Sequence, residues 1–411
     1  MSYLNGTHVG TFLLQILVLL VTAKSMGALL RRWGHPEMIG GILAGILLGP
    51  AVLDRMIPKT LFPPEPLPQA MLGTASWFGM FFLILILGFE TRLTTVWQEN
   101  KSFLKIGIGS ALFPLAMGTL VFWWGQQGWW GNNASRLTFS LCMAAAAAIT
   151  TIPIVSRMFH GLQTLEACPR LVVVSASMVN NILVWFFLVV VLGLTCRAQA
   201  GPDTTLGVLF KIILFATVCL TIGRALAGYI TRKLRKAFLL EAATILTIMS
   251  CLGLLCGAIT QRIGIGAVPG FFLAGIMMGN TNEISERSRE LVSQMVSAVF
   301  VPIFFATIGL KIDFLRNMDM ALVIIFMTVA LGGKFIGAWL GALWASLSRE
   351  DAVSIGITHV PGGAAAIVIG LLALEFNLIS EKAFGAVVFA TMLSSILAYP
   401  VLCRILKINK V

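Results

Sequence analysis

Six polar side chains stand inside long apolar segments of this sequence, and they are its candidates for binding and proton transfer. They are Thr150, Thr151, Asn180, Asn181, Lys334 and His359. Hydroxyl and amide oxygens are neutral ligands that suit sodium or potassium, because hard cations favour oxygen. An amine or an imidazole can carry a proton. This combination favours the binding of a monovalent cation or a small polar solute, and it indicates no metal site beyond such a cation.

Two interruptions of the apolar segments lie beside three of these side chains, those of Thr150, Thr151 and His359. Their proline and glycine residues are Pro153, Pro361, Gly362 and Gly363. Proline lacks an amide proton and glycine relaxes the backbone, so both stretches leave polar backbone groups unpaired. Lipid cannot satisfy such groups, so broken helices persist at membrane depth only where they are buried in protein or line a cavity. Matching breaks in the two halves of a membrane protein are typical of a transporter's binding site.

Each polar residue also has a purely structural interpretation. A lysine in the middle of a membrane helix costs about 2.5–3.5 kcal/mol, so Lys334 should face protein or water. It then either carries a proton or permanently holds carbonyl groups of the broken helices. His359 either titrates as a proton carrier or holds a carbonyl at a helix end. Asn180 and Asn181 either bind the transported species or form interhelical hydrogen bonds, which average about 0.6 kcal/mol in membranes.

The composition predicts a polytopic membrane protein. Of 411 residues, 58% are hydrophobic and 11% are charged, and the mean hydropathy is +0.93. Soluble domains are about 45–50% apolar and about 25% charged. The formal charge of +12 comes from basic residues in short loops, which is the positive-inside pattern and not a nucleic-acid surface. Walker, HExxH and GxGxxG motifs are absent, so we expect no enzyme activity and no cofactor.

Apolar segments long enough for a hydrocarbon core predict an all-α fold of about thirteen transmembrane helices. They lie near residues 11–30, 37–53, 71–89, 103–124, 136–159, 170–195, 205–228, 238–261, 265–280, 291–310, 320–346, 351–374 and 382–404. The fifth and the twelfth segments contain the interruptions at 150–153 and 359–363. The matching places of these interruptions predict an internal repeat of two halves.

The basic residues set the predicted orientation. With the N-terminus outside, the inner loops contain about twice as many lysine and arginine residues as the outer loops. We therefore expect a multi-pass protein of a cell membrane with its C-terminus in the cytoplasm. The run Arg232–Lys236 is predicted to anchor this topology and to contact membrane lipid. Gly40-Gly41 and Gly332-Gly333 are predicted helix-packing points.

Five ordered stretches resemble the cation:proton antiporter-2 family, which includes Kef-type and sodium/proton exchangers. They are HPEMIGGILAGILLGP (35–50), AITTIPIVSRM (148–158), VPGFFLAG (268–275), VFVPIFFATIGLKID (299–313) and KFIG (334–337). The resemblance covers nearly the whole chain and implies the sodium/proton antiporter fold in a homodimer. In that fold an inverted repeat places the two unwound helices so that they cross near the middle of the membrane.

This fold implies three regions within a single membrane transporter domain. A dimerisation scaffold would comprise about 1–90 and 238–310, a transport core about 100–195 and 320–405, and a linker helix about 205–228. Some relatives carry a C-terminal nucleotide-binding domain, and we expect none here because the chain stops at Val411.

The resemblance also implies a site, and this chain departs from it. Relatives usually have an aspartate where this chain has Asn181, and a core lysine where it has Lys334. They often read Pro-Arg-Gly-Glu where residues 361–364 read Pro-Gly-Gly-Ala, and glutamate where Gly41 stands. We therefore predict a divergent member in which the proton is carried by Lys334 or His359.

Three functions remain open from these residues. The leading hypothesis is a secondary active transporter that exchanges sodium or potassium for protons by elevator-like alternating access. A site without acids that keeps Lys334, His359 and helix N-termini would also suit an organic anion or a polar metabolite. The third hypothesis is a sensor that keeps the fold without transport. The expected partners are the transported species, membrane lipid and a second copy of the chain, and not nucleic acid.

Overall fold

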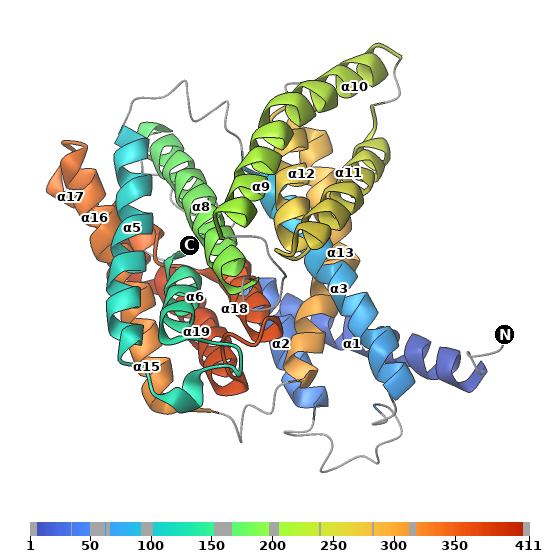
Figure 1. The fold of residues 1–411 in the computed structure, drawn as a ribbon, viewed down its shortest axis with the longest axis horizontal. Helices are drawn as coiled ribbons and strands as arrows, with labels where there is room; N and C mark the ends of the chain where they lie inside the picture. Colours follow the sequence, from blue (N-terminus) through green and yellow to red (C-terminus); the bar gives the residue numbers. More distant parts are fainter. Residues whose placement is uncertain are drawn as a thin grey trace. The chain divides into compact units, whose positions relative to one another are not determined.

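The computed structural model describes residues 6–33, 35–49, 62, 66–91, 102–151, 167–196, 205–237, 240–281, 283–311 and 318–405. These residues are helical apart from their connections, and one isolated bridge joins Trp130 and Ile379. The chain forms two compact units (Figure 1). Unit 1 comprises residues 1–88, 224–256 and 271–317, and unit 2 comprises residues 89–223, 257–270 and 318–411. The predicted all-α class is confirmed.

Unit 1 is built on close contacts between glycine-rich helices. It contains α1 (Gly6–Arg32), α2 (Glu37–Leu48), α3 (Pro66–Phe89), α10 (Arg224–Lys236) and α13 (Glu286–Lys311), with most of α11 (Ala242–Ile263) and α12 (Val268–Gly279). A Cβ atom at Gly40 would meet the backbone of Gly27, and one at Gly41 would lie 2.9 Å from Phe305. Glycine lets the backbones of two helices approach closely. Close packing, and not the hydrophobic effect, holds helices together in a membrane. The predicted packing at Gly40 and Gly41 is confirmed.

Unit 2 contains both interrupted helices. Its elements are α5 (Ser102–Trp123), η2 (Gln127–Trp129), α6 (Arg136–Ala148), α8 (Ala167–Cys196), α9 (Thr205–Val218), η3 (Cys219–Gly223), α15 (Met320–Thr328), η4 (Val329–Gly333), α16 (Lys334–Trp344), α17 (Arg349–Thr358), α18 (Gly363–Glu375) and α19 (Glu381–Ile405). α5 packs against α6, α8 and α16, and α6 packs against α18. The predicted core segments 100–195 and 320–405 fall within this unit.

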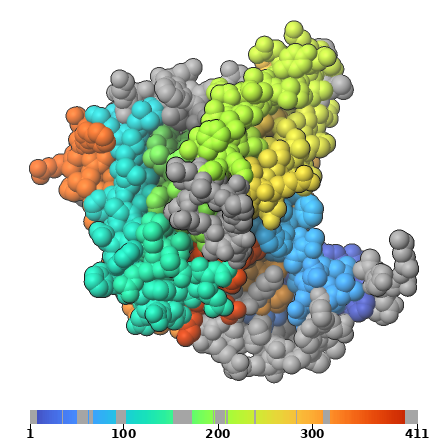
Figure 2. Space-filling model, viewed as in Figure 1, coloured from blue at the N-terminus to red at the C-terminus, as the bar shows by residue number. Residues whose placement is uncertain are grey.

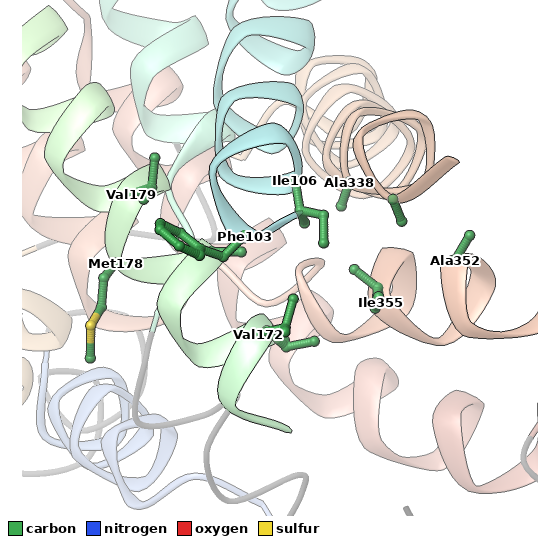
Figure 3. Close-up of a cluster of buried hydrophobic side chains, with 11 residues drawn as sticks. Phe103, Ile106, Val172, Met178, Val179, Ala338, Ala352 and Ile355 are labelled. Carbon is green, nitrogen blue, oxygen red and sulfur yellow. The ribbon is translucent and has the colours of Figure 1, made fainter. Parts of the chain in front are cut away.

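A buried apolar cluster holds α5, α8, α16 and α17 in place (Figure 3). Phe103 and Ile106 of α5 meet Val179 of α8, Ala338 of α16 and Ile355 of α17, among other members. Between membrane helices the gain comes mainly from dispersion and close packing, because lipid is as apolar as the side chains. The cluster fixes the helices from which the polar candidates at positions 180, 181, 334 and 359 project.

Helix length and composition identify a multi-pass membrane protein. Eight of the described helical segments are long and apolar enough to cross a membrane, and a ninth results if the bent pair Arg349–Thr358 and Gly363–Glu375 is one span. Shorter apolar helices lie at Glu37–Leu48, Arg136–Ala148 and Val268–Gly279. Leu112 and Leu120 of α5 are exposed, as expected for a lipid-facing helix. Figure 2 shows this helix, cyan to teal, at the surface of the molecule. The count of about thirteen spans stays a prediction.

One helix continues beyond its predicted end. The segment expected at 205–228 continues through the π-helical turn η3 into α10 and ends only at Lys236. The basic run predicted to be a loop thus forms the last helical turns, where cations are favourable. Arg235 and Arg232 pair with Glu283 at 2.9 and 3.4 Å. The hydrogen bond from Arg235, helped by both guanidinium charges, lowers the pKa of Glu283.

Candidate functional site

The first interruption follows the last turn of α6. The helix contains a run of buried alanines and ends at Ala148. Ile149 has an extended backbone (φ −70°, ψ 142°), and Thr150 and Thr151 are non-helical. Pro153, which was predicted to break this segment, lies outside the described residues.

The second interruption separates α17 from α18. α17 ends at Thr358, α18 begins at Gly363, and the two axes differ by 50°. The intervening stretch contains His359, Pro361 and Gly362, as the sequence predicts. Gly363 has φ +54°, a left-handed conformation that glycine adopts without strain.

The two interruptions contact each other directly. The hydroxyl of Thr150 donates a hydrogen bond to the carbonyl oxygen of His359 at 2.9 Å. The amide of Thr151 donates to the carbonyl of Pro361 at 3.3 Å, and its hydroxyl donates to that of Gly362. Each broken segment therefore satisfies backbone groups that the other leaves unpaired, which is what survival at membrane depth demands.

Asn180 ties α8 to the first interruption and uses its whole amide to do so. Its Oδ1 accepts from the backbone N–H of Thr150 at 3.1 Å. Its Nδ2 donates to Ser110 Oγ and to the Ala148 carbonyl, both at 3.2 Å. The side chain is fully buried. Asn180, expected to bind the ion, therefore serves first as a cap for the end of α6.

Asn181 differs from its neighbour in having an unused acceptor. Its Oδ1 is buried and has no hydrogen-bond partner among the described residues, and the residue is 4% exposed. An unpaired buried carbonyl costs about 1–3 kcal/mol, so such a group is a natural ligand for an incoming donor or cation. Of the two predicted asparagine ligands, this one is available.

Lys334 lies where α16 begins, immediately after the π-helical turn η4. It is 1% exposed, and its Nζ donates to the carbonyl oxygen of Ile149 at 3.2 Å. A Cβ atom on Gly362 would lie 3.3 Å from the same nitrogen. Beneath the turn, Gly333 packs against Pro114 of α5. The lysine therefore reaches both interruptions, and among the described residues it forms no ion pair.

His359 has a defined arrangement of its two ring nitrogens. Nδ1 lies 2.9 Å from the carbonyl oxygen of Ile355, and because a carbonyl only accepts, Nδ1 carries the proton. Nε2 is then the acceptor, and it lies 3.5 Å from Ser177 Oγ. The single proton of that hydroxyl is shared between Nε2 and the carbonyl of Val173, which lies at 3.0 Å, so the hydroxyl can donate to only one of them at a time. The buried imidazole thus bridges α17 and α8.

All six predicted residues are buried, and we call them the core polar cluster: Thr150, Thr151, Asn180, Asn181, Lys334 and His359. The hydrogen bonds described above link five of them through the two interruptions, and Asn181 belongs to the group as the residue that follows Asn180 on α8. Within the described part of the chain, none of them bonds a carboxylate, and no group of three or more His, Cys, Asp or Glu residues could hold a metal ion. Ser110, Ser177 and the Ile149 carbonyl also contribute and were not predicted. A serine within an apolar helix is the one signal that marks the first two.

The comparisons with known proteins identify the class. A sequence model described as "Sodium/hydrogen exchanger, transmembrane" matches residues 16–407. The match covers nearly the whole chain, so the chain belongs to the sodium/hydrogen exchanger family. The predicted resemblance is confirmed at the level of the family. The homologues of the chain are transporters and not enzymes.

Individual relatives agree with this assignment. The chain is 27% identical to the Na(+)/H(+) antiporter of Enterococcus hirae, covering 93% of this chain and 95% of that protein. It is 26% identical to the Na(+)/H(+) antiporter NhaS4 of Synechocystis sp., covering 96% of both. Against Cation/H(+) antiporter 17 of Arabidopsis thaliana the identity is 24%, and the match spans 48% of that longer protein.

A solved structure shares the fold. The sodium proton antiporter MjNhaP1 from Methanocaldococcus jannaschii superimposes with a TM-score of 0.68 over 96% of both chains. The sequence identity is 15%, so the likeness establishes architecture alone.

Proposed function

We propose that this chain is a secondary active antiporter that exchanges sodium or potassium for protons at the core polar cluster. The observation that carries the proposal is the chemistry of two groups. Asn181 has a buried oxygen without a hydrogen-bond partner among the described residues, and Lys334 bonds a backbone carbonyl in place of a carboxylate from that part of the chain. Relatives whose names specify sodium or cation exchange with protons support the same function.

The proton and the cation would compete at Lys334. The protonated amine of Lys334 donates a hydrogen bond to the Ile149 carbonyl oxygen, and its charge repels any cation nearby. Two unit charges about 4 Å apart repel by about 4 kcal/mol at an effective dielectric of 20, which is about a thousandfold in affinity. Loss of the proton removes the repulsion and frees the carbonyl. A cation can then use that oxygen together with Asn181 Oδ1, while threonine hydroxyl oxygens retain lone pairs for it.

This scheme fixes a stoichiometry. The cluster contains no described carboxylate, so it carries one positive charge with a proton on Lys334 and one positive charge with a cation bound. Exchange of one cation for one proton leaves the charge of the moving part unchanged. Transport would therefore be electroneutral. His359, whose Nε2 accepts, is the second candidate for carrying the proton.

The larger movements follow the same proposal. The core at about 100–195 and 320–405 would move as an elevator against a dimerisation scaffold at about 1–90 and 238–310. The protein would be a homodimer in a cell membrane with the N-terminus outside. Cross-linking between single cysteines in opposite copies of the scaffold would test the dimer, and labelling of terminal tags in sealed vesicles would test the orientation.

The decisive experiment measures coupled fluxes. The purified protein is reconstituted in vesicles with a pH-sensitive dye inside, and sodium or potassium gradients are imposed over a range of pH. We expect cation-dependent proton movement that is insensitive to membrane potential. Empty vesicles and the variant Lys334→Gln are the controls. The absence of cation-dependent proton movement at every pH would remove the proposal.

A second candidate function rests on the unpaired lysine itself. A buried cation without a described carboxylate partner also suits a small organic anion. The two functions predict opposite effects of Lys334→Gln. Anion binding should be lost, whereas cation binding should be kept or strengthened because the repelling charge is gone. Thermal-shift measurements with small carboxylates and with sodium or potassium salts distinguish them.

A further inference from the structure

The two short helices α6 and α18 each have one end at the core polar cluster. Their other ends are also joined to each other by hydrogen bonds. The loop that precedes α6 donates from Asn133 N–H to the carbonyl of Asn377, just after α18, at 3.0 Å. Ser380 N–H donates back to the carbonyl of Trp129 at 3.0 Å. The near ends are joined by the threonine contacts described above. α6 and α18 also pack against each other (Figure 1). The hydrogen bonds therefore link them at both ends.

A carboxylate ties this far end to a third helix. The indole Nε1 of Trp129 donates to Asp319 Oδ2 at 2.7 Å, a short charge-assisted hydrogen bond. The other carboxylate oxygen of Asp319 caps α15 by accepting from Leu322 N–H at 3.2 Å. Trp129 is 6% exposed. We call Trp129, Asp319, Asn377 and Ser380 the loop clasp.

An aromatic layer secures the start of α6 under the clasp. The Trp130 ring lies 6.1 Å from that of Phe139. The guanidinium of Arg136, the first residue of α6, lies 5.8 Å from the Trp130 ring and 5.9 Å from that of Trp123. Cation–π contacts of this kind contribute about 0.5–1 kcal/mol each at exposed sites. The first turn of α6 is therefore held on several sides.

We propose that Trp129 and Asp319 are positioning residues for ion binding, acting through α6 and α18. The inference rests on the function proposed above. α6 spans 13 residues, or about 20 Å at 1.5 Å per residue. A tilt of about 3° at the clasp would move the far end of such a rigid rod by about 1 Å. That end holds the Ile149 carbonyl and Thr150, so the clasp sets where these ligands stand.

Two matched pairs of variants open the clasp without touching the site. Trp129→Phe removes the indole donor and keeps an apolar ring, and Trp124→Phe, at an 82% exposed position of the same loop, is its control. Gly131→Ala places a Cβ atom against the backbone of Asn377, whereas Gly128→Ala meets nothing within 4 Å. The glycine pair leaves Trp129 unchanged. If Trp129→Phe fails to fold, the comparison of Gly131→Ala with Gly128→Ala still tests the loop clasp.

The first readout separates positioning from loss of folded protein. Cation-dependent proton flux is measured in vesicles, and we expect Trp129→Phe and Gly131→Ala to raise the KM for the cation by about three- to thirtyfold. Vmax per folded protein should change less. A purely structural clasp would lower the yield or Vmax and leave KM unchanged. Equal KM values within each matched pair would overturn the proposal.

The second readout is independent of transport. Cys142 lies in the middle of α6 and is 1% exposed, so its modification by a small maleimide, read by mass spectrometry, reports opening of this helix. We expect faster modification in Trp129→Phe and Gly131→Ala than in their controls, and unchanged modification would count against the clasp. If the protein without substitutions exchanges no ions, the proposed function fails. The comparison of maleimide modification rates still decides whether the loop clasp holds α6.

Discussion

The ammonium nitrogen of Lys334 lies 3.2 Å from the carbonyl oxygen of Ile149. That oxygen is available because α6 stops at Ala148, and the residue four positions further on, Pro153, has no N–H that could donate to it. The interruption therefore creates the acceptor that lets a buried lysine remain in the membrane core without a described carboxylate. A group bonded only to a neutral carbonyl can release its proton without leaving a counter-ion behind.

The first prediction separates charge from titration at position 334. Lys334→Arg keeps a cation there permanently, because arginine does not release its proton in proteins. We expect this variant to fold and to exchange no ions. Lys334→Gln should bind the cation but move no protons. Lys105→Arg is the control, since Lys105 also donates to a carbonyl, that of Trp344, from an exposed position. Exchange by Lys334→Arg at the unmodified rate would contradict the scheme.

The second prediction contrasts the two neighbouring asparagines. Asn180→Ala removes three buried hydrogen bonds, and at about 0.6 kcal/mol each the loss is about 2 kcal/mol. Asn181→Ala removes an unpaired oxygen and should leave stability nearly unchanged. We expect Asn180→Ala to lower Tm, and Asn181→Ala to raise the KM for the cation at an unchanged Tm. The reverse assignment of these effects would show that Asn180 is the ligand.

Much of the fold could be predicted because the membrane dictates it. The segment predicted at 103–124 is α5 at Ser102–Trp123, and the break at 359–363 lies between α17 and α18. Ends outside the apolar region were less predictable. α10 continues to Lys236 because Ala227 and Thr231, four residues apart, both face the protein interior. Basic side chains alone do not end a helix.

The details of the site depended on rotations that sequence does not reveal. Adjacent helical residues point about 100° apart, so which asparagine meets the Thr150 amide follows from the packing of α8. The π-helical turn η4 sets the direction of Lys334 in the same way. A Cβ atom on Gly333 would lie 2.9 Å from the Met117 side chain, whereas one on Gly332 would meet nothing within 4 Å among the described residues. The predicted packing role of Gly332 is therefore wrong.

The third prediction concerns the backbone of the second interruption. Gly363 has φ +54°, where a residue with a side chain costs about 1–2 kcal/mol, and a Cβ atom would collide with the Thr151 side chain. We expect Gly363→Ala to lower Tm and to abolish exchange by separating the two interruptions. Gly385→Ala, which meets nothing within 4 Å, should behave as the unmodified protein. A fully active Gly363→Ala would show that the contact is dispensable.

The fourth prediction is a pH dependence of stability at Asp319. Partial burial alone would raise its pKa, but hydrogen bonds from Trp129, Leu322 and Ala321 and the charge of Lys382 lower the pKa below its ordinary value. A carboxyl with a lowered folded pKa stabilises the protein above its unfolded pKa, and this contribution is lost as pH falls through the folded value. The Tm advantage over Asp319→Ala should be constant above about pH 5 and shrink below about pH 4. Trp129→Phe should show a smaller change over the same range, and an advantage that persists at low pH would contradict this account.

The fifth prediction adds an acid to the core polar cluster. Asn181→Asp places a carboxylate where the amide oxygen has no hydrogen-bond partner among the described residues, so a cation gains a charged ligand. We expect the KM of this variant for the cation to fall by about tenfold or more. Opposite charges in contact gain several kcal/mol before the desolvation cost is subtracted. The cation should now displace two protons, one from the new acid and one from Lys334. Exchange would then move net charge and respond to an imposed membrane potential.

Vesicles loaded with sodium and clamped at positive or negative potential provide the measurement. The unmodified protein should ignore the potential, Asn181→Asp should follow it, and Asn181→Ala should remain insensitive with weaker cation binding. Potential-independent exchange by Asn181→Asp would mean that Lys334 does not release its proton during the cycle. If Asn181→Asp exchanged ions and the unmodified chain did not, the fold would be competent but the native substrate would be another species. The buried lysine would then favour a small anion as that substrate, for the electrostatic reason that makes it a poor neighbour for sodium.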